Sequence, residues 1–300
     1  MNKIWKLKNV KVGVAPILWT NDDMPELGGD ISFDRAISEM AQAGYQGTEI
    51  GNKFPKDEKI LLRELKKYNL EIASAWFSGY IISDFEKNFQ DFQKHCLFLK
   101  ALGAKVVVFS EQTYSIQGQN KPLFKDKPYF TNQEFENLAQ GLNKFGRWSK
   151  QHGIELVYHH HMGTGIQSLK ETEKILELTD PEFVSLIFDT GHFAHAGEDI
   201  VFCLKRLISR IRHIHLKDIR KEKINELKTK NLSFLEGVKQ GIFTVPGDGD
   251  IKNYPLFFEL LAKNNYQGWL IVEAEQDPRK ANPLEYAKKA MDYLRSLISW

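Results

Sequence analysis

Short apolar runs alternate with longer amphipathic segments along the whole chain. Between the short runs, apolar residues recur at helical spacing, as in Phe33, Ile37 and Met40. Strands that alternate with helices in this way favour parallel pairing. The eight runs rich in Val, Ile and Leu that we interpret as strands are 11–17, 47–51, 71–77, 104–110, 154–159, 184–189, 211–215 and 269–273.

Several of the predicted helices end in the same way, with a residue that tolerates the left-handed conformation placed just before the next strand. These residues are Gly44, Asn69, Gly103, Gly153 and Asn265. Eight strand and helix units in 300 residues, with no low-complexity linker, predict an α/β protein with a single (β/α)8 TIM barrel over residues 1–300. The main alternative, a Rossmann-type sheet, lacks a G-x-G-x-x-G motif after the first strand.

Two connections are longer than the others, and both follow a strand. They cover residues 111–130 and 220–250, and we expect both to be long loops on the C-terminal rim of the barrel. Loops at this rim usually shape or cover an active site, and an oligomer contact is the alternative.

Composition and charge are those of an ordinary globular protein, with 42% hydrophobic residues, 27% charged residues and a net charge of +2. This balance gives no reason to expect binding to nucleic acid or to a membrane. No stretch of 18 apolar residues and no apolar signal segment occurs, so we predict a cytoplasmic protein. Cys96 and Cys203 lie inside predicted helices and are expected to pack in the core.

Polar side chains that can bind metals finish four consecutive predicted strands, within residues 158–161, 189–192, 213–218 and 273–275. In a parallel barrel, catalytic groups come from these strand ends. Successive side chains of a strand point to opposite sides, which groups His159 with His161 and separates them from His160. The inward ligands selected by depth along each strand are His159, Asp189, His215 and Glu273. A set of imidazoles and carboxylates suits manganese, cobalt, iron or zinc.

Two further segments have weaker signals. Residues 19–23 (WTNDD) follow the first strand, where an exposed Trp19 beside amides and carboxylates would hold a polyhydroxylated ligand; a capping loop is the alternative. Residues 245–251 (VPGDGDI) are rich in glycine but match no phosphate-binding loop, so we interpret them as a turn at the rim.

The chain resembles the inosose dehydratase family, within the xylose isomerase-like superfamily of TIM barrels. The resemblance spans nearly the whole sequence, and its first segment is long and unusual. The segments that support it are APILWTNDDMPELGG (15–29), GTEIGNKFP (47–55), YHHHMGTG (158–165), FDTGHFAHAG (188–197), HIHLKD (213–218) and IVEAEQDP (271–278).

The resemblance implies dehydration of 2-keto-myo-inositol (scyllo-inosose), a small polyhydroxylated cyclic ketone, to a trihydroxycyclohexane-dione in inositol catabolism. It also implies manganese or cobalt, with glutathione as a further cofactor. Members of the superfamily usually bind their metal through Glu, Asp, His and Glu. Asp189, His215 and Glu273 match the last three positions, whereas His159 stands where the isomerases and epimerases have Glu. His161 is the alternative ligand on that strand.

Dehydration beside a ketone needs a base and an acid. We expect Glu273 or Glu275 as the base, and His192 or a histidine of residues 159–161, such as His161, as the acid. The expected substrate contacts are Trp19, Asn21, Glu49, His192 and Lys217. The alternative function is a metal-dependent sugar or inosose isomerase or epimerase on the same barrel, and the sequence leaves homo-oligomer formation open.

Overall fold

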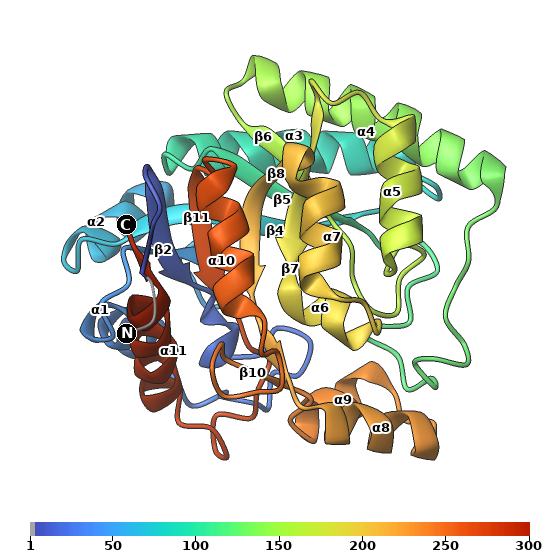
Figure 1. Cartoon of the computed structure of the whole chain (residues 1–300). Helices are drawn as coiled ribbons and strands as arrows, with labels where there is room; N and C mark the ends of the chain where they lie inside the picture. The colour runs from blue at the N-terminus through green and yellow to red at the C-terminus, as the bar shows by residue number, and fades with distance from the viewer. Residues whose placement is uncertain (1–3) are drawn as a thin grey trace.

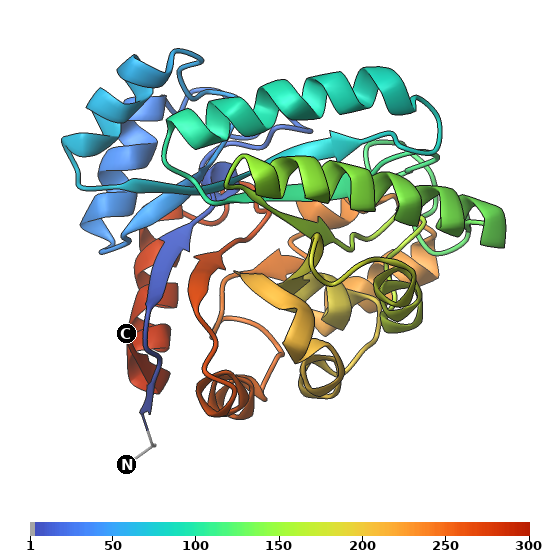
Figure 2. The same cartoon turned by 90° about the horizontal axis from the view of Figure 1, so that it is seen from above.

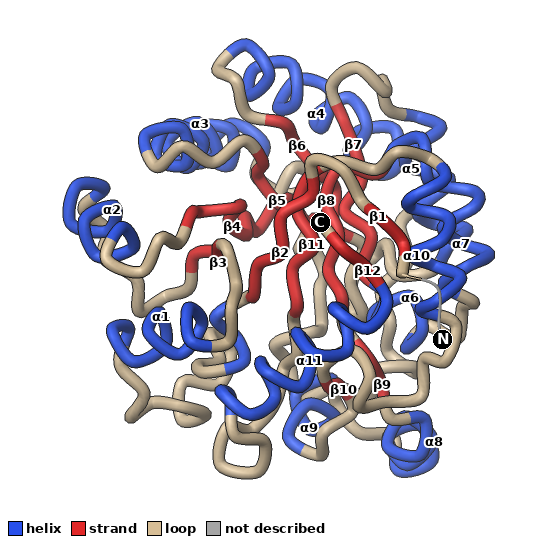
Figure 3. Tube along the Cα trace, turned by 60° about the vertical axis from the view of Figure 1, so that its left-hand side comes forward, coloured by secondary structure: helices blue, strands red, loops and turns tan. Residues whose placement is uncertain are grey.

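Eight parallel strands close into a barrel at the centre of the molecule, and helices surround it (Figures 2 and 3). The computed structural model describes residues 4–300, so the first three residues of the predicted 1–300 domain lie outside it. The strands pair in the order β11-β2-β3-β4-β5-β6-β7-β8, which confirms the predicted (β/α)8 barrel. Their bounds are β2 Val10–Val14, β3 Gly47–Ile50, β4 Glu71–Gly79, β5 Val106–Glu111, β6 Glu155–His159, β7 Val184–Asp189, β8 Ile211–Leu216 and β11 Gly268–Val272.

The helices follow the strands and pack their apolar faces against the barrel (Figure 1). The residues expected to end five of them have positive φ angles, from 51° at Asn265 to 89° at Gly44. The helices are α1 Phe33–Gln42, α2 Glu58–Lys66, α3 Phe85–Ala101, α4 Asn132–Gln151, α5 Leu169–Leu178, α6 Thr190–His195, α7 Ile200–Leu207, α8 Lys221–Lys230, α9 Phe234–Lys239, α10 Tyr254–Lys263 and α11 Pro283–Leu297, with short 3-10 turns η1 Pro16–Leu18 and η2 Ile208–Arg210.

The two long connections differ from each other. Residues 112–130 contain no helix or strand, as expected, and their backbone meets the second connection where the N–H of Leu123 donates to the carbonyl oxygen of Leu232, at 3.0 Å. The second connection, 220–250, is not a loop. It folds into α8 and α9, and its strand β10 Phe243–Thr244 pairs antiparallel with β9 Asp218–Ile219. Figure 1 shows α8 and α9 as a helical hairpin set apart from the helices around the barrel.

A partly buried ion pair holds the first connection in place. The ammonium group of Lys127 donates to Glu171 Oε1 at 2.7 Å, and Glu171 Oε2 accepts from the backbone N–H groups of Gln167 and Ser168 at the start of α5. Burial opposes ionisation of Glu171, but Lys127 and these two amides lower its pKa below the ordinary value. Residues 112–130 are therefore fixed to the barrel by a charged contact as well as by packing.

At the opposite end of the barrel, strand β1 Trp5–Lys6 pairs in parallel with β12 Ile298–Ser299. Cys96 and Cys203 are buried and unpaired, as predicted. Among residues 4–300, none of the helices combines the length and the apolar character that a membrane crossing requires.

Candidate functional site

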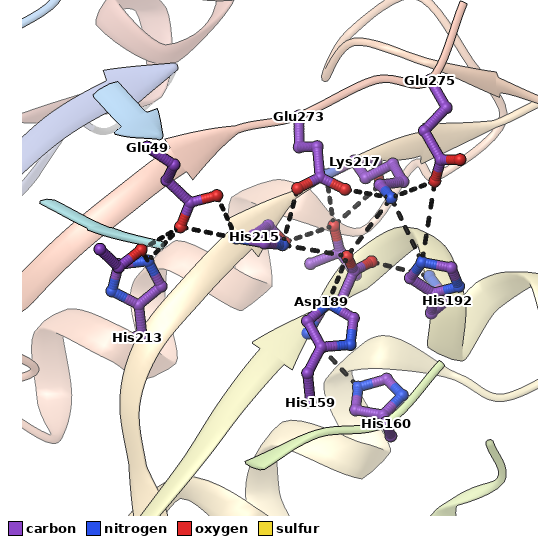
Figure 4. Close-up of polar contacts among 12 residues, drawn as sticks. Glu49, His159, His160, Asp189, His192, His213, His215, Lys217, Glu273 and Glu275 are labelled. Atoms are coloured by element: carbon purple, nitrogen blue, oxygen red, sulfur yellow. Dashed lines mark hydrogen bonds and ion pairs between the residues drawn. The ribbon is translucent and has the colours of Figure 1, made fainter. Parts of the chain in front are cut away.

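Four side chains that end neighbouring strands converge at the mouth of the barrel, as the sequence predicts (Figure 4). His159 closes β6, Asp189 closes β7, His215 lies near the end of β8, and Glu273 follows β11. His159 Nε2 is 3.6 Å from Asp189 Oδ2, and His215 Nδ1 is 3.5 Å from the same oxygen. His215 Nδ1 is also 3.0 Å from Glu273 Oε2. Asp189 Oδ2 and His215 Nδ1 nevertheless have no partner in hydrogen-bonding geometry among the described residues.

The three consecutive histidines divide as strand alternation predicts. His159 and His161 line the cavity at the mouth, whereas His160 points away and stacks on Phe193 at a centroid distance of 3.6 Å. Nε2 of His160 accepts the backbone N–H of Asp189 at 3.4 Å, which ties β6 to the end of β7. His159 falls in a cluster with Asp189 and His215, and His161 falls in another cluster.

Glu49 on β3 is the acceptor for two histidines of β8 (Figure 4). Its Oε1 lies 3.0 Å from His213 Nε2, and both of its oxygens lie 3.1 Å from His215 Nε2. Ser74 donates to Oε1 as well. Because a carboxylate only accepts, Nε2 of His215 carries a proton, and Nδ1 faces Asp189 and Glu273. Burial favours the neutral ring, but Glu273 and Glu49 raise the pKa of His215 well above its ordinary value. Burial opposes ionisation of Glu49, but His215 and His213 hold its pKa well below the ordinary value.

Lys217 is completely buried, and its ammonium group lies among carboxylates. It forms ion pairs with Glu273 Oε1, with Glu275 Oε1 at 3.0 Å and with Asp189 Oδ2 at 3.6 Å. Burial favours the neutral amine, but these carboxylates raise the pKa of Lys217 above its ordinary value. Burial likewise opposes ionisation of Glu273, whose pKa is lowered to about 2 by His215 and Lys217.

Glu275 and His161 line the cavity, and His192 lies buried beside them. Burial raises the pKa of Glu275 to about 7, although Lys217 opposes the shift. Its Oε2 has no hydrogen-bond partner among residues 4–300, and the side chain lines the cavity. Burial lowers the pKa of both His161 and His192 well below the ordinary value. Nδ1 of His161 donates to the carbonyl oxygen of Met162 at 2.8 Å, so its Nε2 carries a lone pair.

The cavity above these groups has a volume of about 300 Å³. Its walls combine apolar surface, including Trp76 and Val108, with polar groups at the mouth from Asp22, Asp23 and Gln117. Trp76 is held in place because its indole N–H donates to Ser78 Oγ at 2.9 Å, and its ring meets that of His159 edge to face. The sequence reasoning missed these lining residues; the only signal for the two aspartates was the acidic end of the segment 19–23.

Two expectations for this rim need correction. Trp19 is not exposed: it is fully buried, and its indole N–H donates to Glu39 Oε2 at 2.6 Å. Asn21 is buried as well, and its side-chain oxygen accepts the backbone N–H groups of residues 23 and 24, the capping role weighed as the alternative. The chain turns into η1 directly after β2, so strand alternation no longer applies there. Neither residue lines the cavity.

Residues 245–251 form a turn at the rim, as the sequence predicts. The turn wraps around the buried carboxylate of Asp218 instead of reaching the cavity. Asp218 Oδ2 accepts the backbone N–H groups of Gly247 and Gly249, and Oδ1 accepts those of Ile219 and Ile251. The glycine at 249 is required by this close approach, because a Cβ atom there would lie 2.4 Å from the Asp218 carboxylate. The segment is a structural turn at the rim.

Comparison with known proteins places the chain among enzymes of one family. The sequence profile of the Xylose isomerase-like TIM barrel family matches residues 37–297. The inosose dehydratase of Mesomycoplasma hyopneumoniae strain J is 99% identical over 300 residues, which is 100% of both chains. The inosose dehydratase of Clostridium tetani strain Massachusetts / E88 is 53% identical over 288 residues, covering 95% of this chain and 96% of that protein.

A solved structure shows the same fold at low sequence identity. The probable 3-DHS dehydratase of petrobactin synthesis from Bacillus anthracis superposes with a TM-score of 0.70 at 18% identity, covering 95% of this chain and 98% of that chain. The identity to the two bacterial relatives, over nearly their whole length, carries the assignment. The chain belongs to the inosose dehydratases, enzymes of the xylose isomerase-like TIM barrel family.

Proposed function

We propose that this chain removes water from 2-keto-myo-inositol (scyllo-inosose) to give a trihydroxycyclohexane-dione, using one divalent ion, manganese or cobalt, at the barrel mouth. The observation that carries the proposal is the cluster of His159, Asp189, His215 and Glu273, buried beneath a cavity in a chain so close to a protein named inosose dehydratase. A cyclic polyol of this size suits a cavity of about 300 Å³.

The donor atoms fit a metal ion. Ligand atoms about 2.1 Å from one ion lie roughly 3.0–3.4 Å apart in octahedral or tetrahedral geometry. The separations here run from 3.0 Å, between His215 Nδ1 and Glu273 Oε2, to 3.6 Å, between His159 Nε2 and Asp189 Oδ2. Asp189 Oδ2 and His215 Nδ1 are buried without a hydrogen-bonding partner among the described residues, which is costly unless something else binds them. His159 lies in the cluster with Asp189 and His215, whereas His161 lies in the cluster with His192 and Glu275, which favours His159 as the ligand from this part of the chain.

When bound, the ion would supply a Lewis acid that polarises the ketone and stabilises the developing enolate. Glu49 would keep His215 in the tautomer that offers Nδ1, as metal-ligating histidines usually require. Glu275 is the better candidate for the base, because both oxygens of Glu273 already contact Lys217 and His215. Oε2 of Glu275 has no such contact and faces the cavity.

The carboxyl group of Glu275 would also deliver the proton to the leaving hydroxyl. His161 uses its one N–H on the Met162 carbonyl, so in its neutral form it can accept but not donate toward the cavity. His192 is fully buried and does not line the cavity. Once Glu275 has taken the α-proton, it becomes the nearest acid to a hydroxyl on the same face of the ring. His161 Nε2 would then accept a hydrogen bond from a substrate hydroxyl.

The ring hydroxyls away from the reacting carbons would meet Asp22 and Asp23 at the mouth, and the apolar ring face would meet Trp76. These residues replace Trp19 and Asn21 as proposed substrate contacts.

The test is direct. Metal-free protein is mixed with scyllo-inosose, and formation of the dione is followed by its absorbance before and after addition of Mn²⁺ or Co²⁺. We expect turnover only with metal, and a loss of about 10²–10⁴-fold in kcat for Glu275→Gln with metal content unchanged. Turnover that persists after chelation would contradict the metal, and epimerised inosose in place of the dione would contradict the reaction.

A further inference from the structure

The ammonium group of Lys217 occupies a position surrounded by side chains that bind divalent metals in other proteins (Figure 4). Its Nζ lies 3.0 Å from Glu275 Oε1, 3.3 Å from His192 Nε2 and 3.6 Å from Asp189 Oδ2, and it also contacts Glu273 Oε1. Three carboxylates and one imidazole thus enclose a single positive charge that solvent does not reach. Carboxylate and imidazole are also the ligand types of the proposed metal site.

The mouth holds more metal-competent groups than one ion uses. His159, Asp189 and His215 form one cluster, and His161, His192 and Glu275 form a second, each with donor atoms within 4.8 Å of one another. A third grouping, Asp189 with His192 and Glu273, joins the two. Lys217 Nζ contacts every member of this joining group. The ammonium therefore fills the space beside the first site where a second ion would share its carboxylates.

The charges balance with one ion and one ammonium. The three carboxylates that contact Lys217, which are Asp189, Glu273 and Glu275, carry three negative charges when ionised, and a divalent ion with Lys217 supplies three positive charges. Glu49 lies outside this group and contacts His213 and His215 instead. Buried charge is tolerated only when it is compensated close by. Without Lys217, one carboxylate beside the first ion would be left uncompensated, and a second cation would be drawn in.

The fold fixes Lys217 in this position. Its backbone N–H donates to Thr190 Oγ1 at 2.8 Å, and its aliphatic stem passes directly over Gly191. A Cβ atom on residue 191 would lie 2.5 Å from Lys217 Cγ, so only glycine leaves room for the stem. The side chain is therefore held between Asp189, His192 and Glu273, and it cannot dissociate as a metal ion can.

We propose that Lys217 is a permanent substitute for a second divalent ion: it closes a latent metal site formed by Asp189, His192 and Glu273, with Glu275 beside it, and so keeps the centre mononuclear. This inference rests on the proposed function only in that the first ion must bind. It gives Lys217 a role other than the substrate contact expected from the sequence.

The experiment counts metal ions per chain. Wild type, Lys217→Ala and Lys127→Ala are equilibrated with excess Mn²⁺, separated from free metal and measured by elemental analysis, and the bound Mn²⁺ is examined by electron paramagnetic resonance. Lys127→Ala is the matched control, because it also removes a buried lysine from a carboxylate, but Lys127 does not line the cavity and contacts none of the proposed ligands. We expect one ion in wild type and in the control, and two in Lys217→Ala with the spectrum of a spin-coupled pair.

Each outcome has a distinct meaning. One ion in both wild type and Lys217→Ala overturns this inference and leaves the proposed function intact, as does an uncoupled spectrum in the variant. Two ions in wild type also overturn it. No ion in wild type contradicts the proposed metal site itself. If Lys217→Ala folds only with metal present, circular dichroism during Mn²⁺ titration shows how many equivalents of Mn²⁺ are needed for folding, which gives the same count. Lys217→Ser also leaves space for an ion, and it must bind the same number of ions as Lys217→Ala.

Discussion

Replacement of Glu49 by Gln should weaken metal binding without contact between residue 49 and the ion. Glu49 fixes His215 through two contacts of 3.1 Å at Nε2, and it also accepts from His213 at 3.0 Å. A hydrogen bond to a charged group contributes about 1.5–3 kcal/mol. If most of this free energy holds the His215 ring and its tautomer in place, the dissociation constant for Mn²⁺ should rise roughly 10–100-fold. This range is typical when a residue that hydrogen-bonds to a metal ligand is replaced.

Isothermal titration of metal-free protein with Mn²⁺ measures this change. Glu71→Gln is the matched control: Glu71 belongs to the neighbouring strand β4, but its carboxylate pairs with Lys11 in solvent and should leave affinity within about twofold of wild type. Nitrogen NMR of His215 reports the tautomer directly. A folded Glu49→Gln variant that binds Mn²⁺ as tightly as wild type, with the proton still on His215 Nε2, would refute the positioning role.

Three further predictions concern stability. Burial lowers the pKa of His195 to about 3, below the unfolded value of about 6.5. The unfolded chain therefore gains a proton first, and the free energy of unfolding falls as pH drops from about 6.5 toward 3. In urea unfolding, His195→Phe should remove about 2 kcal/mol of the loss between pH 6.5 and 5, and an unchanged loss would contradict this. Asp218→Asn can keep only one carbonyl-type oxygen for four backbone N–H groups, so we expect a loss of about 1–3 kcal/mol and faster proteolysis within residues 245–251, whereas resistance equal to wild type would count against the anchoring role. Lys127→Met removes the cation from the partly buried Glu171, which still accepts from backbone N–H groups, so we expect a loss of about 1–3 kcal/mol in the same assay, which a double variant that also carries Glu171→Gln should partly restore.

Where the chain keeps a regular period, the sequence alone was enough to place side chains. Alternation along β6 separated His160 from its neighbours, and the strand ends brought together His159, Asp189 and His215. The same reasoning failed at Trp19, because the strand ends at Val14 and a 3-10 turn begins at Pro16, three residues before Trp19, which places the ring in the core. It also failed for 220–250, since α8 has few apolar residues to mark its helical period.

Partners distant in the sequence could not be foreseen. Glu49 and His215 are 166 residues apart, and Lys217 and Glu275 are 58 apart. Both contacts arise because barrel closure brings β3, β8 and the residues after β11 to one mouth. A local pattern identifies a polar strand end, but which cation or imidazole it meets depends on the register between strands.

The hairpin of α8 and α9 has a consequence for how this enzyme could diversify. The aromatic ring of Phe234, at the start of α9, has its centroid 5.1 Å from that of His161 and 6.1 Å from that of His192. Helices α8 and α9 nevertheless lie apart from the helices that surround the barrel (Figure 1). The hairpin thus contacts His161, which lines the cavity, while the proposed metal ligands come from the strand ends. Residues 221–240 could therefore change in sequence or length among relatives without disturbing the barrel. Such changes would alter which ring substituents are accepted, while the strand ends would keep the groups that carry out the reaction.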